Sequence, residues 1–269
     1  MMTPERTRKP RQSRSPQVLR ATLAIRELIL TGEWRAGQRL SEPQLAVRVG
    51  MSRTPLRLAM EILEHEGLVE RRPGGGFAVR KFTLADIEEA VMLRGILEGT
   101  VARLATERPG GPADLSHMEP ALFEMDGLLG KELTVDVLTR YVAANERFHK
   151  GLLGLVPAPL LSRLVHQVVA VPFASPNAFF MAHLGTPKAR QVLVTAQEQH
   201  HAIVEAIAQR QGARVEALVR EHARLVLRFL TSAIHDRESF RRFPGGQLIE
   251  FPAFGSPRSG LPYSSPTEE

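Results

Sequence analysis

The chain contains no cysteine among its 269 residues. Disulfide bonds, thiolate metal sites and cysteine nucleophiles are therefore excluded, and the composition fits a reducing cytosol. The chain also lacks a run of about 18 apolar residues, the length at which a helix becomes a candidate to span a membrane. No apolar stretch follows the basic residues of the N-terminus, as a secretory signal would require. We therefore expect a cytoplasmic protein that is neither exported nor membrane-spanning.

Acidic residues are scarce in the first third of the chain. Residues 1–82 contain 16 Lys and Arg against 8 Asp and Glu, a balance of +8, whereas residues 83–269 contain 19 against 21, a balance of −2. A basic module joined to a nearly neutral one is typical of a protein that binds a polyanion through one end. At this length and with 43% hydrophobic residues, the chain can form two domains with separate cores.

Two short helices are expected within the basic part. Ser41 and Gln44 predict a capping box that starts the first helix, and Gly50 stops it. Ser52 can cap the second helix, whose buried stripe consists of Leu56, Met60 and Leu63. Arg53, Thr54 and Arg57 lie off that stripe. Two helices three residues apart, the second presenting cations at its N-terminal end, predict a helix-turn-helix that reaches the major groove of DNA.

A β-hairpin should follow the second helix, which Gly67 ends. Leu68–Arg72 and Phe77–Lys81 are short strand-like runs, and Pro73–Gly76 between them is a turn. Glycine at its tip lets the backbone approach a phosphate closely. The hairpin is the wing of a winged helix. The alternative is an ordinary small α/β subdomain whose arginines form a solvated face.

Residues 17–81 resemble the GntR family of bacterial transcription regulators. The matching words include Ala36-Gly37-Gln38-Arg39-Leu40-Ser41-Glu42, Ser52-Arg53-Thr54-Pro55-Leu56-Arg57 and Glu66-Gly67-Leu68-Val69. The resemblance implies DNA binding, with Arg53, Thr54 and Arg57 as base and phosphate contacts. The full set of candidate DNA contacts is Ser52, Arg53, Thr54, Arg57, Arg48, Arg35 and Gly75. Pro43 departs from the family, which usually has a basic residue there.

The rest of the chain is expected to be helical, so the fold class is mostly α. Residues 83–238 show no further strand pattern, and their Pro and Gly breaks divide them into a bundle of six or seven helices. Thr83, with Asp86 at the third helical position, starts the first of these. Residues 16–81 form the winged helix. The composition of residues 1–15 predicts a disordered basic arm, and that of residues 243–269 predicts a disordered tail.

Histidines interrupt apolar stripes on three of the expected helices. On the helix over 134–156, Asn145 and His149 break a line formed by Val135, Leu138, Val142, Leu152 and Val156. His200 and His222 interrupt similar lines on the last two helices. In an antiparallel hairpin around Gly212 these two are each about 15–18 Å from the turn, so they lie level. Buried polar groups need partners. The four residues either pair separately, as satisfied core groups, or share a divalent cation such as Zn²⁺ or Ni²⁺.

Arg94 and Glu98 interrupt the stripe of the first bundle helix in the same way. One interpretation is an internal salt bridge that fixes helix packing. The other places Arg94 at a cavity, where its guanidinium binds the carboxylate of a ligand, with Glu98 beside it.

Residues 83–234 resemble the FCD effector domain of the FadR-type GntR regulators. The matching words are Leu93-Arg94-Gly95-Ile96-Leu97-Glu98, Asn145-Glu146-Arg147-Phe148-His149, and the segments that contain His200 and His222. The resemblance implies a divalent metal at Asn145, His149, His200 and His222, with small carboxylates bound beside it. The family more often has Asp where this chain has Asn145. A neutral amide is a weaker ligand and leaves the site more positive.

The resulting hypothesis is a homodimeric transcription regulator that binds a pseudo-palindromic DNA operator. Its helical domain would sense a small organic acid and thereby alter operator binding. Two alternatives stay open at this point: a metal-dependent enzyme that uses the histidines, and an architectural DNA binder without a ligand.

Overall fold

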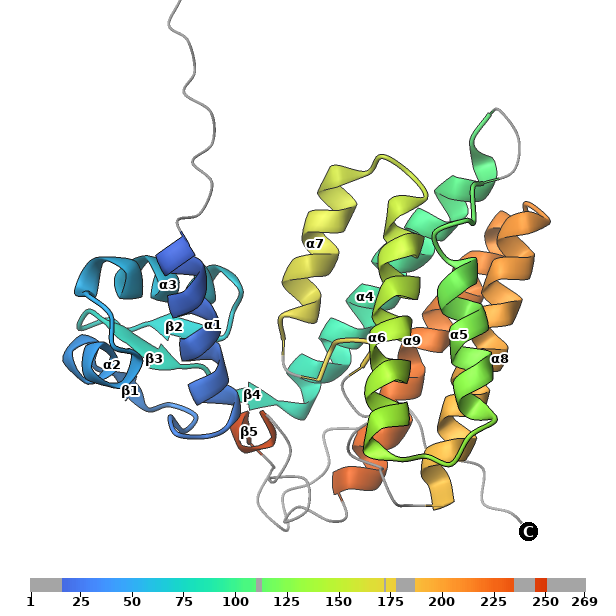
Figure 1. Ribbon diagram of the computed structural model, residues 1–269. Helices are drawn as coiled ribbons and strands as arrows, with labels where there is room; N and C mark the ends of the chain where they lie inside the picture. The colour runs from blue at the N-terminus through green and yellow to red at the C-terminus, as the bar shows by residue number, and fades with distance from the viewer. Residues whose placement is uncertain (1–15, 110–112, 172, 178–186, 235–244, 251–269) are drawn as a thin grey trace, which may run out of the picture.

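The protein has two parts, connected by a short strand (Figure 1). The computed structural model describes residues 16–109, 113–171, 173–177, 187–234 and 245–250. The predicted basic arm, 1–15, and residues 251–269 of the predicted tail lie outside the described residues.

The N-terminal part contains three helices and a small antiparallel sheet. The elements are α1 (Pro16–Leu30), β1 (Arg39–Leu40), α2 (Glu42–Val49), α3 (Arg53–His65), β2 (Val69–Arg71) and β3 (Phe77–Val79). β2 and β3 are the predicted hairpin, with Glu70 opposite Ala78. β1 was not predicted, because two residues are too few to show an alternating pattern. It pairs with β3, so the strand order is β1-β3-β2.

The ends of α2 and α3 agree with the sequence in position but not in every hydrogen bond. Gly50 ends α2 in the left-handed region, at φ 69°, and its N–H donates to the carbonyl of Ala46. Ser41 is the N-cap residue, yet its side chain makes no capping hydrogen bond, so the predicted capping box is wrong. Pro43 in the first turn removes one of the N–H groups that such a cap would satisfy.

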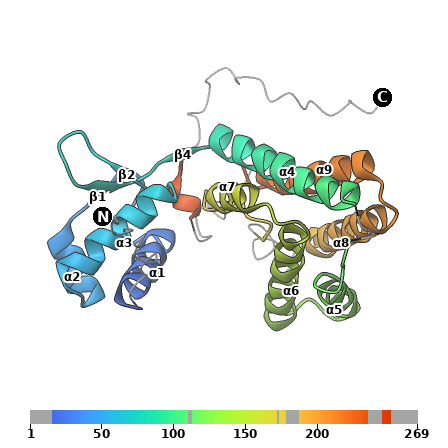
Figure 2. The ribbon, with the colours of Figure 1, turned by 90° about the horizontal axis from the view of Figure 1, so that it is seen from above.

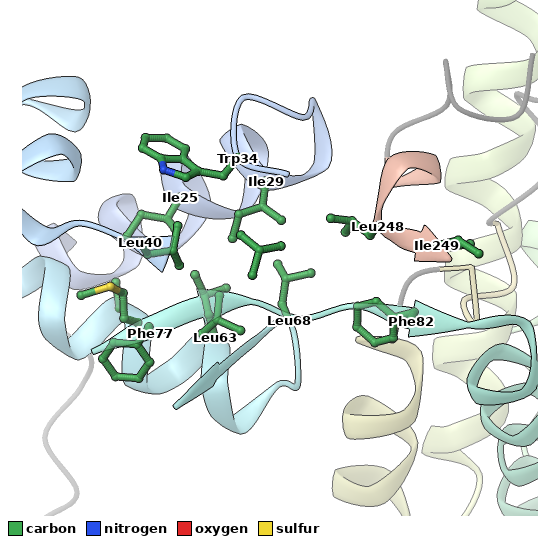
Figure 3. Packing of buried hydrophobic residues seen from close by; sticks show 14 of the residues in the cluster. Ile25, Ile29, Trp34, Leu40, Leu63, Leu68, Phe77, Phe82, Leu248 and Ile249 are labelled. Atoms are coloured by element: carbon green, nitrogen blue, oxygen red, sulfur yellow. The ribbon is translucent and has the colours of Figure 1, made fainter. Parts of the chain in front are cut away.

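A hydrophobic cluster between α1, α3 and the sheet forms the core of the N-terminal part (Figure 3). Ile25 and Ile29 of α1 are fully buried and meet Leu63 of α3 there. Trp34, the only tryptophan of the chain, belongs to the same cluster. The cluster continues into the helical part through Ile87 and other buried residues.

The C-terminal part is a bundle with six helices among the described residues (Figure 2). These are α4 (Leu84–Glu107), α5 (Glu119–Leu129), α6 (Val135–Gly154), α7 (Pro159–Val169), α8 (Pro187–Ala208) and α9 (Gly212–Ile234). The capping box of Thr83 and Asp86 at the start of α4 is confirmed. The mostly helical fold class with a winged N-terminal domain is therefore confirmed. Among the described helices, none combines the length and the apolar character needed to cross a bilayer.

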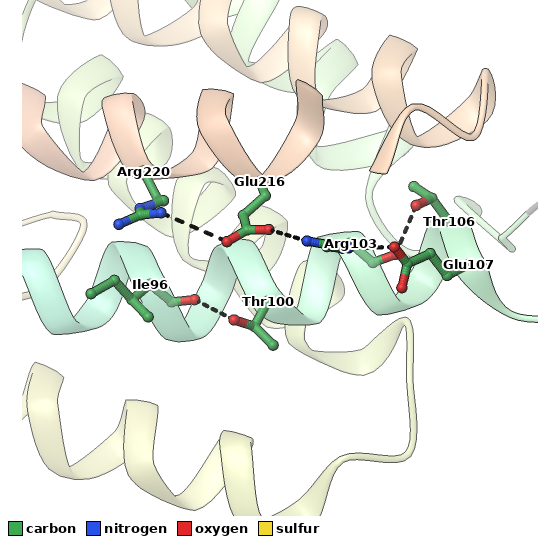
Figure 4. Close-up of polar contacts among 7 residues, drawn as sticks. All are labelled: Ile96, Thr100, Arg103, Thr106, Glu107, Glu216 and Arg220. Carbon is green, nitrogen blue, oxygen red and sulfur yellow. Dashed lines mark hydrogen bonds and ion pairs between the residues drawn. The ribbon is translucent and has the colours of Figure 1, made fainter. Parts of the chain in front are cut away.

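Two glycines let α4 and α9 lie in close contact. A Cβ atom on Gly95 would come within 3.0 Å of the Ala223 Cβ, and one on Gly99 within 3.1 Å of the Glu216 carbonyl oxygen. Toward the end of α4, Arg103 bridges Glu107 at 2.7 Å and Glu216 of α9 at 3.2 Å (Figure 4). Small residues thus set the spacing of the two helices, and ion pairs at the solvent edge align them.

The segment Gly245–Glu250 differs from the expected disordered tail. It forms a short 3-10 helix, η2 (Gly246–Leu248), and a strand, β5 (Ile249–Glu250), which pairs in parallel with β4 (Phe82–Thr83). Leu248 and Ile249 are buried in the core of the N-terminal part. The prediction of a disordered tail is therefore wrong for Gly245–Glu250, because two apolar side chains find a place in a distant core.

Candidate functional site

The N-terminal end of α3 presents four of the residues predicted to contact DNA. Ser52, Arg53, Thr54 and Arg57 are all exposed. Ser52 is the N-cap of α3, and its side chain makes no capping hydrogen bond. Among the described residues, Arg53 and Arg57 have no hydrogen-bond or ion-pair partner, and they lie one turn apart on one face of α3. Pro55 and Leu56 face the core instead.

The tip of the wing is open. The Arg72 N–H donates to the Gly76 carbonyl at 3.1 Å, and the Gly75 N–H donates to the Arg72 carbonyl at 2.9 Å. Gly75 has φ +84°, and a Cβ atom there would meet nothing within 4 Å. The left-handed backbone requires glycine, and the exposed tip leaves room for a close approach to a phosphate.

The arginines of this domain divide into paired and unpaired groups. Arg48, a predicted DNA contact, makes two hydrogen bonds to Glu33 at 2.6 and 2.8 Å, and these lower the pKa of that carboxyl. Within the described part of the chain, Arg35 has no ion pair, in line with its predicted role. Among the described residues, three further exposed arginines without ion pairs, Arg20 of α1, Arg39 of β1 and Arg72 of the wing, were not predicted. The position of Arg72 directly before the wing turn was the available signal.

The three predicted histidines meet inside the bundle. His149 of α6, His200 of α8 and His222 of α9 are all buried. The Nε2 atoms of His200 and His222 are 3.1 Å apart, and those of His222 and His149 are 3.4 Å apart. In a tetrahedral zinc site with bonds of 2.0–2.1 Å, ligand nitrogens are separated by about 3.3 Å. Three candidate ligand atoms lie within 4.8 Å of one another, so the cluster has the dimensions of a metal site.

Oxygen acceptors within hydrogen-bond distance orient two of the three rings. His200 Nδ1 is 3.1 Å from Gln197 Oε1, and His222 Nδ1 is 3.1 Å from Gln199 Oε1.

The third ring faces a carboxylate without a hydrogen bond to it: His149 Nδ1 is 3.4 Å from Glu98 Oε2. An oxygen atom next to each Nδ1 favours the tautomer with a proton on Nδ1, which turns three Nε2 lone pairs toward one another. Three lone pairs at this separation repel unless a cation or a proton lies between them. Burial, and then the neighbouring histidines, lower the pKa of His200 and His222 well below the ordinary value, which favours the neutral form that binds metals.

Asn145 lies one helical turn before His149 on the same buried face of α6. Its Nδ2 donates to Asn177 Oδ1 at 2.8 Å, whereas its own Oδ1 is buried without a partner. A fixed amide with a free acceptor oxygen fits a fourth ligand or an orienting group beside the histidines.

Arg94 and Glu98 are both buried, but they do not form the salt bridge that was one interpretation of the sequence. Arg94 donates to the carbonyl oxygens of Ala174, at 2.8 Å, and Ala223, at 3.3 Å. Glu98 faces His149 instead. Burial alone raises the pKa of Glu98, but the neighbouring His149 and Arg94 outweigh this effect and lower it, so the carboxylate is ionised at neutral pH.

The buried side-chain polar atoms without a partner all belong to these site residues. Among the described residues they are Arg94 Nε, Glu98 Oε2, Asn145 Oδ1 and His149 Nδ1. An unsatisfied buried polar group is destabilising by about 1–3 kcal/mol, so native proteins keep few of them. Their concentration on facing parts of α4 and α6, next to three converging imidazoles, is typical of a ligand site.

Sequence reasoning missed Gln197 and Gln199. Gln197 precedes His200 by one turn of α8, and it also donates to Asp126 Oδ1 of α5 at 2.8 Å. Periodicity could have suggested Gln197, which shares the inner face of α8. Gln199 contacts a histidine on another helix, so only the packing of α8 against α9 reveals it.

Comparison with known proteins agrees with both parts of this description. The model of the bacterial regulatory proteins of the gntR family matches residues 17–79, and the FCD domain model matches residues 89–225. The chain belongs to the GntR family of DNA-binding transcription regulators and carries an FCD effector domain. The family and its homologues are regulators, not enzymes, which removes the enzyme alternative.

Individual relatives are distant. An uncharacterized HTH-type regulator of Bacillus subtilis, YdhC, is 29% identical over 154 residues, or 57% of this chain and 67% of YdhC. An uncharacterized HTH-type regulator of Agrobacterium vitis is 34% identical over 144 residues, or 53% of this chain and 82% of that protein. The structure of E. coli McbR/YncC has a TM-score of 0.58 at 20% identity, covering 81% of this chain and 98% of that one, and it supports the fold alone.

Proposed function

We propose that this protein is a cytoplasmic, homodimeric transcription regulator that binds a pseudo-palindromic operator and senses a small carboxylate through a metal in its FCD domain. The observation that carries the sensing part is the set of three histidines whose Nε2 atoms converge while each Nδ1 faces an oxygen acceptor. That arrangement is suited to a cation and leaves three lone pairs in repulsion without one.

His149, His200 and His222 would hold the ion, with Asn145 beside them. Three imidazoles and an amide oxygen suit Zn²⁺ or Ni²⁺. None of these four side chains is an anion, so the ion's charge would not be neutralised by its own ligands. The bound ion supplies a Lewis-acidic centre that attracts an anionic ligand, and the chemical class that fits is a small carboxylate.

Arg94 is the second positive group in this region. Two of its nitrogens are held by the carbonyl oxygens of Ala174 and Ala223, and Nε has no partner. A guanidinium with a free N–H can donate to a carboxylate of the effector. Arg94 is hydrogen-bonded to Ala223 of α9 and to Ala174 in the segment before α8. Binding of a ligand to Arg94 would therefore change the contacts of both elements.

Dimerisation is supported by the outer face of α4. Met92, Leu93, Ile96 and Leu104 are exposed by 39–50% and recur at helical spacing on this face. A solvent-facing apolar stripe on a long helix fits a contact with a second copy. Two winged helices related by a two-fold axis would read two half-sites whose centres are about 34–36 Å apart, or a multiple of that distance.

The direct test of the sensing function is metal analysis of the purified protein together with a thermal-shift screen of organic acids. We expect Zn²⁺ or Ni²⁺ in the wild type and its loss in His200→Ala. A melting shift from an organic acid should require the metal. Operator binding without metal and without any effect of small acids would favour the alternative of an architectural DNA binder.

A further inference from the structure

A short C-terminal segment, Gly245–Glu250, is part of the DNA-binding domain's core. Leu248 is fully buried and Ile249 is 5% exposed, and both belong to the cluster that contains Ile25 and Ile29 of α1. Figure 3 shows the Leu248 side chain directed toward that core, whereas Ile249, which is paired with Phe82, lies on the side of the segment nearer the bundle. A segment from the far end of the sequence therefore completes the apolar interior of a domain formed by the first eighty residues.

Backbone and polar contacts fix the segment at several points. β5 pairs in parallel with β4, with Phe82 opposite Ile249 and Thr83 opposite Glu250. The Gly245 N–H donates to the Leu30 carbonyl at the end of α1 at 2.8 Å. Lys81 Nζ is 2.5 Å from Glu250 Oε1.

Gly32 makes room for the segment. Its φ is +85°, and a Cβ atom there would overlap the side chain of Gln247 at 1.7–2.0 Å. A residue other than glycine would be strained in the backbone and would also displace Gln247. The surface after α1 is therefore shaped to accept this segment closely.

These contacts lie at the connection between the DNA-binding domain and the bundle. β4 is the connection between the wing and α4, and Thr83 is the N-cap residue of α4. Gly245–Glu250 thus holds the end of α1 and the interdomain connection at the same time. Without it, only the core residues shared with α4 and α9 and the contact of His65 with Gln167 at 3.1 Å would oppose rotation of the DNA-binding domain about the bonds near Phe82 and Thr83.

We propose that Gly245–Glu250 is an interdomain clamp that fixes the orientation of the winged helix on the bundle. The clamp follows α9 in the chain, and α9 carries His222. It is therefore covalently joined to the helix that contributes to the histidine cluster. The clamp depends neither on a metal nor on DNA, so its test can use the isolated protein.

The first experiment measures the orientation directly. The chain has no cysteine, so Glu61→Cys on α3 and Glu198→Cys on α8, both exposed positions, can carry a unique pair of spin labels. Labelled protein is diluted into an excess of unlabelled protein so that only distances within one subunit contribute. Double electron–electron resonance measures the distance between the two labels. It should give a narrow distance distribution in the parent and a distribution at least twice as wide after Leu248→Asp.

The control is Leu23→Asp, the same change at a half-exposed position of α1. It should keep the narrow distribution. An unchanged distribution after Leu248→Asp would overturn the proposal.

A second experiment leaves the core intact. Thr83→Cys with Glu250→Cys places thiols on paired residues of neighbouring strands, which are separated by about 4.7–4.9 Å, within the range that a disulfide spans. Mild oxidation should form this bond rapidly and raise the melting temperature reported by the fluorescence of Trp34, with the reduced protein as the control. Thiols that stay free after oxidation would show that the segment does not dock there, and they would contradict the clamp even if Leu248→Asp fails to fold.

Discussion

Replacing Gln199 with leucine should weaken metal binding although Gln199 is not a ligand. Gln199 Oε1 is the acceptor that holds His222 Nδ1 at 3.1 Å. Leucine has a similar volume but no acceptor, so the ring loses both its orientation and its preferred tautomer. Loss of such an orienting partner typically weakens metal affinity by about 10–100-fold.

The magnitude follows from linkage between metal binding and unfolding. With metal at about 100 times its Kd, binding raises the free energy of unfolding of the wild type by about 2.7 kcal/mol. This corresponds to a rise of about 5–11 °C in melting temperature for a domain of this size. If the site binds metal 10–100-fold more weakly, the same metal concentration raises the free energy of unfolding by only about 0.4–1.4 kcal/mol. The metal-induced shift in melting temperature then falls to about one-seventh to one-half of the wild-type shift.

Thermal unfolding with and without Zn²⁺ or Ni²⁺ measures this directly. Gln191→Leu, at an exposed position on the same helix, should keep the wild-type shift, and Gln199→Glu, which retains an acceptor oxygen, should restore most of it. The reasoning would be refuted by a Gln199→Leu protein whose metal-induced shift equals that of the wild type.

Three further predictions concern other parts of the structure. Gly99→Leu should separate α4 from α9 and lower the free energy of unfolding by about 1–3 kcal/mol or more, measured by urea denaturation, because even a Cβ atom would lie 3.1 Å from the Glu216 carbonyl oxygen. Glu33→Gln should tighten operator binding severalfold at low salt, since Arg48 is released from its ion pair; equal affinity in a gel shift would remove Arg48 from the interface. Ile96→Lys should shift the protein toward monomers in analytical ultracentrifugation, and an unchanged dimer would place the dimer contact elsewhere.

The periodicity of apolar residues along a helix was sufficient to predict which of its side chains are buried. The lines through His200 and His222 put both histidines in the core, and the level position predicted from Gly212 agrees with the distance between their Nε2 atoms, 3.1 Å. The winged helix was predicted from helix boundaries, turns and the hairpin, although neither Ser41 nor Ser52 makes the expected capping hydrogen bond. Val135 was assigned to a buried line but is 57% exposed, because it is the first residue of α6 and lies at the edge of the bundle.

Contacts between elements distant in the sequence could not be predicted. The pairing of Arg48 with Glu33 joins α2 to the loop after α1, and charge counting alone treats both as free. Glu98 faces His149 on another helix, at 3.4 Å, and no helical spacing indicates this. β4 and β5 have two residues each, so neither shows an alternating pattern, and their pairing depends on where Leu248 and Ile249 find a core.

The central claim is that α3 offers unpaired guanidinium groups to DNA. Its most direct test is an operator gel shift at several salt concentrations with Arg53→Ala and Arg57→Ala, and with Arg163→Ala, which removes the same charge from an exposed position on α7. We expect each α3 variant to lose at least tenfold in affinity and to reduce the salt dependence by about one ion per lost phosphate contact, while Arg163→Ala binds as the wild type does. Equal affinity for all four proteins would contradict the account.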